Sequence, residues 1–422
     1  MDKTSRGSVA PKGAPSGKHF VASMALQALG AVSALGVAYL ISLRLGLPAQ
    51  GHFGLLKGWS DVLVTVLLFG LPQSLLHYSY SNEISLGRLR GFARRYCMIL
   101  FAVAVVAAAA LAAFDHEPTG WVVLAVPGLV FHGLLRALLL RSGGVIAYAL
   151  VTVIPSVSLA VFVAVLVGLR LDRWEWGIVA SSVLSVLFVV RMAASLGLEK
   201  PVNSGPMSKG MWRSNLHSFV FNVSAAAQPA MLLTIVSALS TSATDVGELS
   251  FALYFLQVFA MFAGFAAPTL YDRYARSATM AVTWVQDGPA MLRLAVIGVV
   301  GLFGVLFALP RILSLVFPGN YLVALDACLI MTVAGAALLV NRLLATLLQV
   351  RGRFGEMGYQ AITRIALSAA GTIGLSSTSI AGPAVSATIA VLVSELAVLV
   401  RAALVVRVLL VADTAARSNS GS

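Results

Sequence analysis

The stretch FGLPQSLLHYSY, residues 69–80, has a counterpart about half a chain further on, FAAPTLYDRYAR, at residues 265–276. The two segments share a Phe, a Pro and a Tyr at one constant offset: Phe69, Pro72 and Tyr78 in the first, and Phe265, Pro268 and Tyr274 in the second. Each segment ends an apolar run. A Pro inside a helix removes a hydrogen bond and kinks the helix. Pro72 and Pro268 are therefore predicted to be matched hinges in two related helices.

A second pair of segments extends the repeat. LLRALLLRSG, residues 134–143, aligns with LLATLLQVRG, residues 343–352, with a shift of one residue. In both pairs the two members end apolar runs that are six runs apart. An even separation gives the two halves the same orientation, so the pattern predicts a parallel repeat about an axis normal to the membrane. The alternative is chance likeness between apolar helices.

The composition places this repeat in a membrane. The chain has 422 residues, of which 59% are hydrophobic and 11% charged, and its mean hydropathy is +0.92. Soluble domains carry about 25% charged residues. About twelve apolar runs are long enough to cross the roughly 30 Å hydrocarbon core. They are centred in residues 20–43, 58–79, 96–114, 119–139, 145–169, 176–197, 214–238, 249–270, 290–316, 322–349, 358–378 and 382–405.

The fold class predicted is therefore an all-α membrane protein with two six-helix bundles related by a pseudo-two-fold axis. The expected organisation is a disordered cytoplasmic tail (1–18), a first bundle (19–198), a cytoplasmic linker (199–210), a second bundle (211–410) and a cytoplasmic tail (411–422).

Basic residues indicate the orientation. The net charge of +13 is concentrated at the ends of apolar runs, which favours a role in topology over nucleic-acid binding. Lys and Arg follow the even-numbered runs, for example Arg88 and Arg90 after the second and Arg351 and Arg353 after the tenth. Because such residues are enriched in cytoplasmic loops, both termini are predicted to lie in the cytoplasm.

Three long segments resemble one family. GLLKGWSDVLVTVLLFGLPQSLLHYSY (54–80), GELSFALYFLQVFAMFAGFAAPTLYDRYAR (247–276) and VFPGNYLVALDACLIMTVAGAALLVNRLLATLLQVRGRF (316–354) are similar to the second, eighth and tenth helices of Wzx-type polysaccharide (O-antigen and capsule) flippases. These belong to the multidrug/oligosaccharidyl-lipid/polysaccharide (MOP) superfamily, which also contains the MATE antiporters and the lipid II flippases. The resemblance covers about residues 20–410.

The resemblance implies two bundles in a V around a central cavity, in a bacterial inner membrane. It implies transfer of an undecaprenyl-diphosphate-linked oligosaccharide from the cytoplasmic to the periplasmic leaflet by alternating access, for surface polysaccharide synthesis. Membrane lipids and polysaccharide polymerase machinery are the other partners expected. The chain departs from many relatives in two places. Gln228 replaces an acidic residue of the seventh helix, and no acidic residue lies between Phe20 and Ser42, where many MATE proteins carry one.

Ionisable residues within spans are costly and point to function. Arg342, Arg364 and Glu395 lie at similar depths on three consecutive predicted helices. Two guanidinium groups and one carboxylate suit a diphosphate, so this group is a candidate anion site. If transport is coupled to a proton or sodium gradient, Glu395 is the candidate sensor. The alternative is that Glu395 and Arg364 form a buried ion pair that only holds the last two helices together.

Other polar side chains are candidates for the cavity wall. His132 aligns roughly with Arg342 in the repeat, although a single His in a helix is more often a structural hydrogen-bond donor. The seventh span is unusually polar, with Asn215, Ser218 and Asn222 on one face and Gln228 on the opposite face. Gln27 is the strongest polar group of the first span.

The sequence leaves several function classes open besides a flippase. No phosphate-binding loop, catalytic pair or metal-ligand spacing occurs, so neither an enzyme nor a cofactor or metal is expected. The first alternative to a flippase is a MATE-like antiporter for drugs or small cations, which an acidic cavity would favour. The second is a membrane-embedded O-antigen polymerase or ligase, which would need a long polar loop that this sequence lacks. The third is a scaffold without transport activity.

Overall fold

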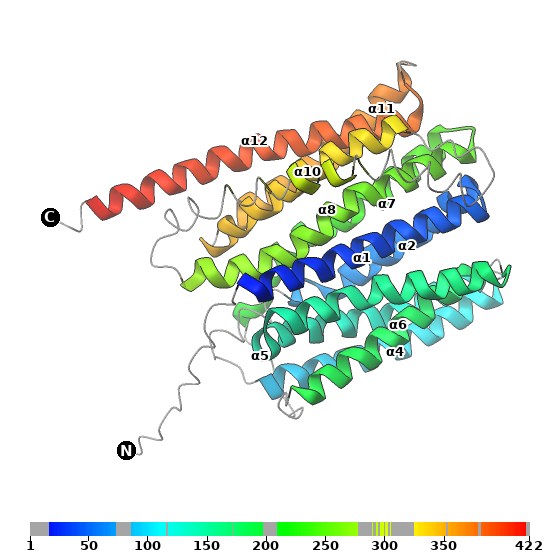
Figure 1. Cartoon of the computed structure of the whole chain (residues 1–422), viewed down its shortest axis with the longest axis horizontal. Helices are drawn as coiled ribbons and strands as arrows, with labels where there is room; N and C mark the ends of the chain where they lie inside the picture. The colour runs from blue at the N-terminus through cyan, green and yellow to red at the C-terminus, as the bar shows by residue number, and fades with distance from the viewer. Residues whose placement is uncertain are drawn as a thin grey trace.

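A computed structural model describes most of the chain. The described residues are 17–72, 86–114, 117–171, 173–196, 209–276, 325–351, 353–378 and 381–418, with a few single positions between 289 and 304. Their helices are α1 (Gly17–Arg44), α2 (Leu47–Leu68), α4 (Leu86–Ala113), α5 (Glu117–Gly168), α6 (Trp174–Ser195), α7 (Lys209–Leu239), α8 (Ala243–Arg276), α10 (Leu325–Val350), α11 (Phe354–Ser377) and α12 (Pro383–Ser418). All of them run roughly along one axis (Figure 1).

The longest helix, α5, is a hairpin of two arms. It contains 52 residues, yet Nε2 of His132 lies 2.8 Å from the carbonyl oxygen of Val151. The guanidinium group of Arg136 lies over the Tyr148 ring, 5.5 Å from its centroid. Residues this far apart in sequence meet only if the chain folds back between the arms. The arms coincide with two apolar segments, Thr119–Leu139 and Ile146–Gly168, which confirms the fourth and fifth predicted spans.

In the described part of the chain, nine segments are long and apolar enough to cross a membrane. Helices α2 and α11 are of similar length but more polar, since Lys57 and Asp61 lie within α2 and Arg364 within α11. With α5 counted as two arms, the described helices correspond to eleven of the twelve predicted spans. The ninth predicted span, 290–316, falls largely outside the described residues.

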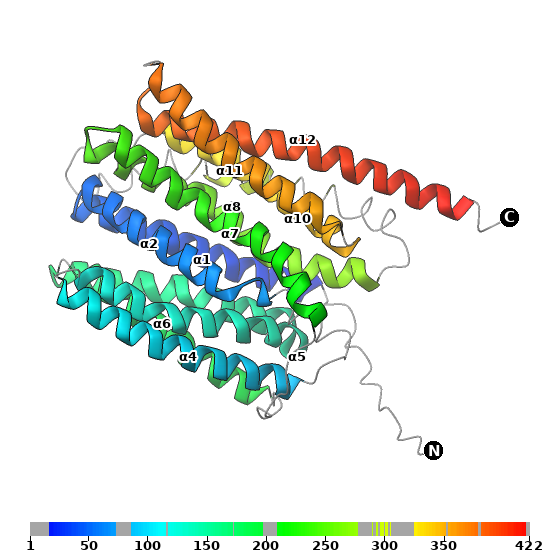
Figure 2. The ribbon, with the colours of Figure 1, turned by 180° about the vertical axis from the view of Figure 1, so that it is seen from behind.

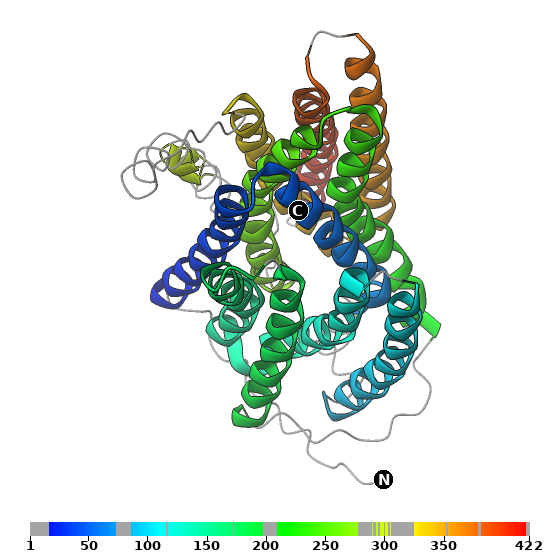
Figure 3. The ribbon, with the colours of Figure 1, turned by 90° about the vertical axis from the view of Figure 1, so that its right-hand side faces the viewer.

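The helices form two groups that meet along a shared interface. Viewed along the helix axes, α4, α5 and α6 lie on one side and α10, α11 and α12 on the other, with α1, α2, α7 and α8 between them (Figure 3). Helix α1 packs on α5, as α7 packs on α11. Across the interface α1 packs on α8, α2 on α7, and α2 on α8. Exchanging the first helix with the seventh and the second with the eighth leaves this pattern unchanged, so the contacts follow the predicted two-fold repeat.

The core is centred on α8. Phe251, Phe255 and Phe259, each one turn after the last, are almost completely buried. They form one apolar cluster with side chains of α1, α2, α10 and α12. A smaller cluster lies among α4, α5 and α6. The helix that belongs to the interface therefore also anchors the C-terminal half.

The second span differs from the prediction. Helix α2 begins at Leu47, with Pro48 in its first turn, and ends at Leu68, whereas residues 58–79 were expected. Phe69 and Gly70 have φ angles of 44° and 67°, in the left-handed region that ends a helix. Pro72 lies beyond this break, while α8 continues through position 268 to Arg276. Left-handed residues before Pro72 therefore end α2, whereas position 268 lies inside α8. The hinge role of Pro72 and Pro268 stays a prediction.

The connections sort to two ends of the bundle. The connections α1–α2, α5–α6, α7–α8 and α11–α12 lie at one end, here called the short-connection end, whereas α10–α11 lies at the opposite end (Figures 1 and 2). Helix α1 begins and α12 ends at the opposite end. Most of the predicted linker, 199–210, lies outside the described residues, and α12 runs through most of the predicted tail 411–422 to Ser418.

Candidate functional site

The two halves touch most closely where α2 crosses α8 near the short-connection end. A β-carbon added at Gly54 would lie 2.0 Å from Oγ of Ser250, and one at Gly247 would lie 2.1 Å from the carbonyl oxygen of Leu47. No side chain fits at such distances. Because both positions are glycine, the two helices pack backbone against backbone, as small residues allow in membranes.

Polar contacts close the same crossing. Nε2 of Gln50 donates to Oγ of Ser250 at 3.1 Å, and that hydroxyl donates to the carbonyl oxygen of Gln50 at 3.0 Å. Further along α2, Nε1 of Trp59 donates to Oγ1 of Thr234 on α7 at 3.3 Å. Where α2 ends, the Phe69 and Phe219 rings lie 4.7 Å apart between centroids. The contact between the halves thus extends along the whole of α2.

A buried ion pair lies inside the C-terminal half. Nε of Arg364 donates to Oε1 of Glu395 at 2.5 Å and Nη2 donates to Oε2 at 3.1 Å, a two-pronged contact between α11 and α12. Nδ2 of Asn341 on α10 donates to Oε2 of Glu395 at 2.8 Å. The two charged side chains are 1% and 0% exposed. The structure thus brings Arg364 and Glu395 together as the ion pair that was the alternative to an anion site.

The ion pair belongs to a longer polar network. Nε2 of Gln228 donates to Oγ of Ser368 at 2.7 Å, and Ser368 donates to Oγ of Ser394 at 2.9 Å. Ser394 precedes Glu395, so both chains of contacts end on one turn of α12. Gln228 thus ties α7 to α11 and is buried, which places it in the packing of the half and not on an open wall.

Two atoms around the ion pair remain without partners. Nη1 of Arg364 and Oδ1 of Asn341 are buried and form no hydrogen bond within the part of the chain that the structure describes. Nε2 and Oε1 of Gln360, one turn before Arg364 on α11, are also buried and form no hydrogen bond within the described residues. A buried polar group without a partner costs free energy, and such atoms also occur in the N-terminal half, for example Oε1 of Gln27.

Arg342 is placed differently from Arg364. Its guanidinium carbon lies 4.5 Å from the centroid of the Phe221 ring on α7, a cation–π geometry. The side chain is partly exposed, and its charge interacts electrostatically with both Arg364 and Glu395. Among the described residues it forms no ion pair. Arg342 is therefore a cation within a span that contacts an aromatic ring and no carboxylate of the described residues.

Two predicted residues of the N-terminal half are structural contacts. His132 is buried, and its Nε2 contacts the carbonyl oxygen of Val151, joining the arms of α5. Gln27 is fully buried, and its Nε2 donates to the carbonyl oxygen of Ala149 at 3.4 Å. Gln27 thus ties α1 to α5, much as Gln228 ties α7 to α11 in the other half.

The remaining predicted residues lie on α7. Asn222 is partly exposed. Asn215 and Ser218 are on the same helix, but their side chains lie outside those that the structure describes. Within the described residues no group of three or more His, Cys, Asp or Glu side chains could hold a metal ion.

Sequence reasoning missed part of the polar network. Gln360, Arg364, Ser368 and Thr372 follow one another at intervals of four residues on α11 and are all buried. That spacing puts them on one helical face and was readable from the sequence. Asn341 was missed because it precedes the more conspicuous Arg342. The partners on α12 could not be assigned without the helix packing.

Comparisons with known proteins bear on the fold. No protein-family model matches the sequence, and no curated protein matches it either. Solved structures do match. An outward-facing MATE-family multidrug resistance transporter of the MOP superfamily has a TM-score of 0.63 at 12% identity, covering 98% of this chain and 100% of the other. The inward-facing form of such a transporter has a TM-score of 0.62 at 12% identity, covering 92% and 98%.

A third match is a MOP-superfamily transporter from Pyrococcus furiosus, with a TM-score of 0.64 at 12% identity, covering 98% of this chain and 100% of that one. Its description states that reverse polarity of the binding pocket suggests a different function. The predicted fold class is confirmed: the chain is a multi-pass α-helical membrane protein with the fold of MOP-superfamily transporters.

Proposed function

We propose that this chain is an alternating-access exporter of the MATE type, which moves amphipathic small molecules across a membrane. The observation that carries the proposal is the interface in which α1 and α2 of one half pack on α7 and α8 of the other. Solved structures with this fold are described in both outward-facing and inward-facing conformations. An interface that joins two related bundles is what a rocking motion between these conformations requires.

The residues suggest how such a motion is supported. The α2–α8 crossing contains Gly54 and Gly247, so few interlocking side chains oppose separation of the helices there. Each half is internally tied by buried polar contacts, including Arg364 with Glu395, which favours movement of the halves as rigid bodies. Glu395 is also the proposed coupling residue, because it is a carboxylate inside a span and its contact with Arg364 joins α11 to α12.

Transport by the purified protein in liposomes tests this function. With a proton or sodium gradient imposed, we expect gradient-dependent movement of a fluorescent amphipathic cation that empty liposomes do not show. The double variant Gln50→Cys/Ser250→Cys, cross-linked across the α2–α8 crossing, is expected to lose this movement. If neither gradient drives any member of a panel of amphipathic cations, an antiporter of this type is ruled out.

The charges inside the spans favour a second candidate, the flipping of an undecaprenyl-diphosphate-linked oligosaccharide. The acidic side chains well inside the described helices are paired: Asp61 with Lys57 at 2.5 Å, and Glu395 with Arg364. Arg342 has no such partner among the described residues. A cationic substrate needs a carboxylate, whereas a diphosphate is best held by guanidinium groups. This charge balance supports an anionic lipid-linked cargo, which polysaccharide polymerase machinery would then use.

A leaflet-accessibility assay with lipid-linked oligosaccharide in liposomes tests the second candidate. Arg342→Ala is expected to lower flipping at least tenfold without lowering the yield of folded protein, while Arg342→Lys keeps part of the activity. Arg407→Ala removes an exposed Arg of α12 and serves as the matched control with normal activity. Full flipping by Arg342→Ala would remove this Arg from the site, and no flipping by the unmodified protein would leave the first candidate alone.

A further inference from the structure

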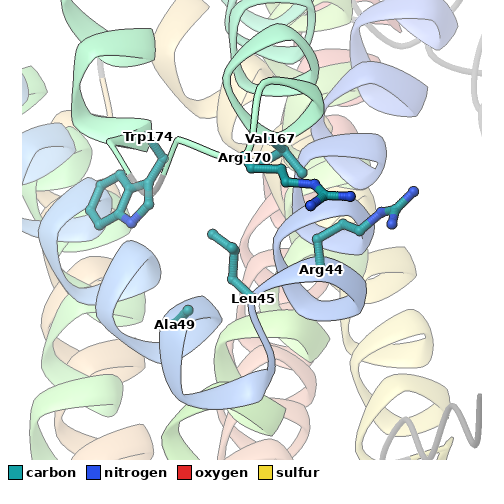
Figure 4. A pocket seen from close by; sticks show the side chains of 6 residues that line it. All are labelled: Arg44, Leu45, Ala49, Val167, Arg170 and Trp174. Atoms are coloured by element: carbon teal, nitrogen blue, oxygen red, sulfur yellow. The ribbon is translucent and has the colours of Figure 1, made fainter.

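A hollow at the short-connection end is lined by residues of the N-terminal half and lies beside the α2–α8 crossing at Leu47 and Gln50. It has a volume of about 730 Å³, within the roughly 300–1,000 Å³ typical of ligand pockets. Its lining comes from the end of α1, the start of α2, the end of α5 and the start of α6 (Figure 4): Arg44, Leu45, Ala49, Val167, Arg170 and Trp174. Two guanidinium groups and an apolar surface therefore face one space.

The end of α5 is built in an unusual way that presents Arg170. The N–H of Arg170 donates to the carbonyl oxygen of Val167 at 3.0 Å, and the N–H of Leu171 to that of Leu166 at 2.9 Å. This pair of hydrogen bonds ends a helix with a left-handed residue that is usually glycine. Here the residue is Arg170, with a φ of 59°. An arginine in a position that favours glycine suggests that the side chain itself is needed there.

The second cation is placed by the end of α1. Arg44 is the last residue of that helix, and the chain then turns at Gly46, which has a φ of 89°. Figure 4 shows the guanidinium groups of Arg44 and Arg170 pointing to the same side of the hollow, and both side chains are exposed. Like charges that face one space are stabilised by a shared anion, and guanidinium groups bind phosphate oxygens through paired hydrogen bonds.

The rest of the lining is apolar and firmly held. Trp174 is 6% exposed, and its ring meets the Phe53 ring edge to face at 5.1 Å between centroids. Leu45, Ala49 and Val167 complete this surface. An apolar wall adds nothing to the binding of a small inorganic anion, whereas it buries the apolar surface of an acyl chain. The lining therefore fits a molecule with an anionic head and an apolar tail.

The level of the hollow agrees with this chemistry. Arg44 ends one membrane-spanning segment, Arg170 follows another that ends at Gly168, and Trp174 begins a third. The ends of spanning segments mark the headgroup region, where Trp and Arg side chains are favoured. We propose that this hollow binds an anionic phospholipid, with its phosphate between Arg44 and Arg170 and an acyl chain against the apolar lining.

Thermal unfolding of the full chain in a zwitterionic detergent tests the proposal. Added phosphatidylglycerol should raise the unfolding midpoint more than phosphatidylcholine does. Arg44→Gln and Arg170→Gly should each remove at least half of that difference, and the double variant should remove all of it. Arg170→Gly is informative because glycine suits the left-handed backbone, so the midpoint without lipid should be unchanged or higher while the lipid effect falls. Arg191→Gln, an exposed Arg of α6, is the matched control and should respond as the unmodified protein does.

Other outcomes overturn the proposal. An equal shift with phosphatidylglycerol and phosphatidylcholine would mean that the headgroup charge is not recognised. An undiminished shift in the double variant, or an equal loss in Arg191→Gln, would place the effect elsewhere on the surface. If millimolar inorganic phosphate reproduces the shift, the hollow binds a free anion and not a lipid. None of these readings depends on transport, so the lipid site and the proposed function can fail separately.

Discussion

At the scale of single residues, variants of the buried pair Arg364–Glu395 can show whether the pair is structural or functional. Two charges that are 1% and 0% exposed have lost their hydration, and each depends on the other to offset that loss. Removal of one partner of such a pair costs about 3–5 kcal/mol, whereas replacement of both by apolar residues is often neutral or stabilising. The two residues can therefore be tested together without unfolding the protein.

We expect Arg364→Ala and Glu395→Ala each to lower the unfolding midpoint strongly, because each leaves a buried charge unpaired. The double variant Arg364→Met/Glu395→Leu should regain most of the lost stability. Thermal unfolding in detergent checks both points. Singles that are as stable as the unmodified protein would argue against a tight buried pair.

Transport by the double variant then decides the role of Glu395. If the pair only joins α11 to α12, the double variant transports normally. If Glu395 couples transport to an ion gradient, the double variant folds but shows no gradient-driven transport. We expect the second result, because Glu395 is an ionisable residue inside a span, where such residues are costly and usually functional.

At the scale of helices, the α2–α8 crossing is the element most sensitive to small changes. We expect Gly247→Ala to destabilise the protein by about 1–3 kcal/mol, the usual cost of overpacking, because the new β-carbon would meet the backbone of Leu47. Gly264→Ala in the same helix is the matched control, since no atom lies within 4 Å of its added β-carbon. That control should be neutral or more stable, by up to about 1 kcal/mol. Thermal unfolding compares them, and equal behaviour would mean that the crossing is loosely packed.

Helices were also where sequence reasoning worked best. Apolar runs predicted eleven described spans, including the two arms of α5, because a bilayer demands a fixed length of apolar helix. The bounds of α2 were missed. Gly46, Pro48 and the pair Phe69–Gly70 are local start and stop signals, but the long apolar run 58–79 outweighed them in the prediction. The hydropathy of a segment predicts whether it lies in lipid. It does not predict where left-handed residues end a helix inside an apolar stretch.

The candidate site was predictable only in part, for a geometric reason. The position of a residue along a helix predicts its depth in the membrane, and this depth is similar for Arg364 and Glu395. The position does not give the direction in which each helix faces its neighbours. The sequence therefore left the ion pair and the anion site as alternatives, and only packing of α10, α11 and α12 showed that Glu395 contacts Arg364 and Asn341, while Arg342 faces α7.

At the scale of the whole molecule, the proposed function requires the two halves to move relative to each other while each stays intact. The contact of Gln50 with Ser250 joins the halves at the short-connection end. The contact of Ser158 with Ser181, 2.8 Å between hydroxyl oxygens, lies within the N-terminal half. The two pairs are similarly close, so cross-links at these pairs differ mainly in whether they span the interface.

We therefore expect Gln50→Cys/Ser250→Cys, oxidised to a disulfide between the two contacting positions, to stop transport, and reduction to restore it. Ser158→Cys/Ser181→Cys, treated in the same way, should keep transport near normal, because it ties together helices that move as one body. The native Cys97 and Cys328 are buried, as are all four introduced positions, so both native cysteines are replaced by Ser in these variants. Equal transport by the two cross-linked variants would contradict rocking of the halves, since a bond across the α2–α8 crossing must hold that end closed if the halves separate there.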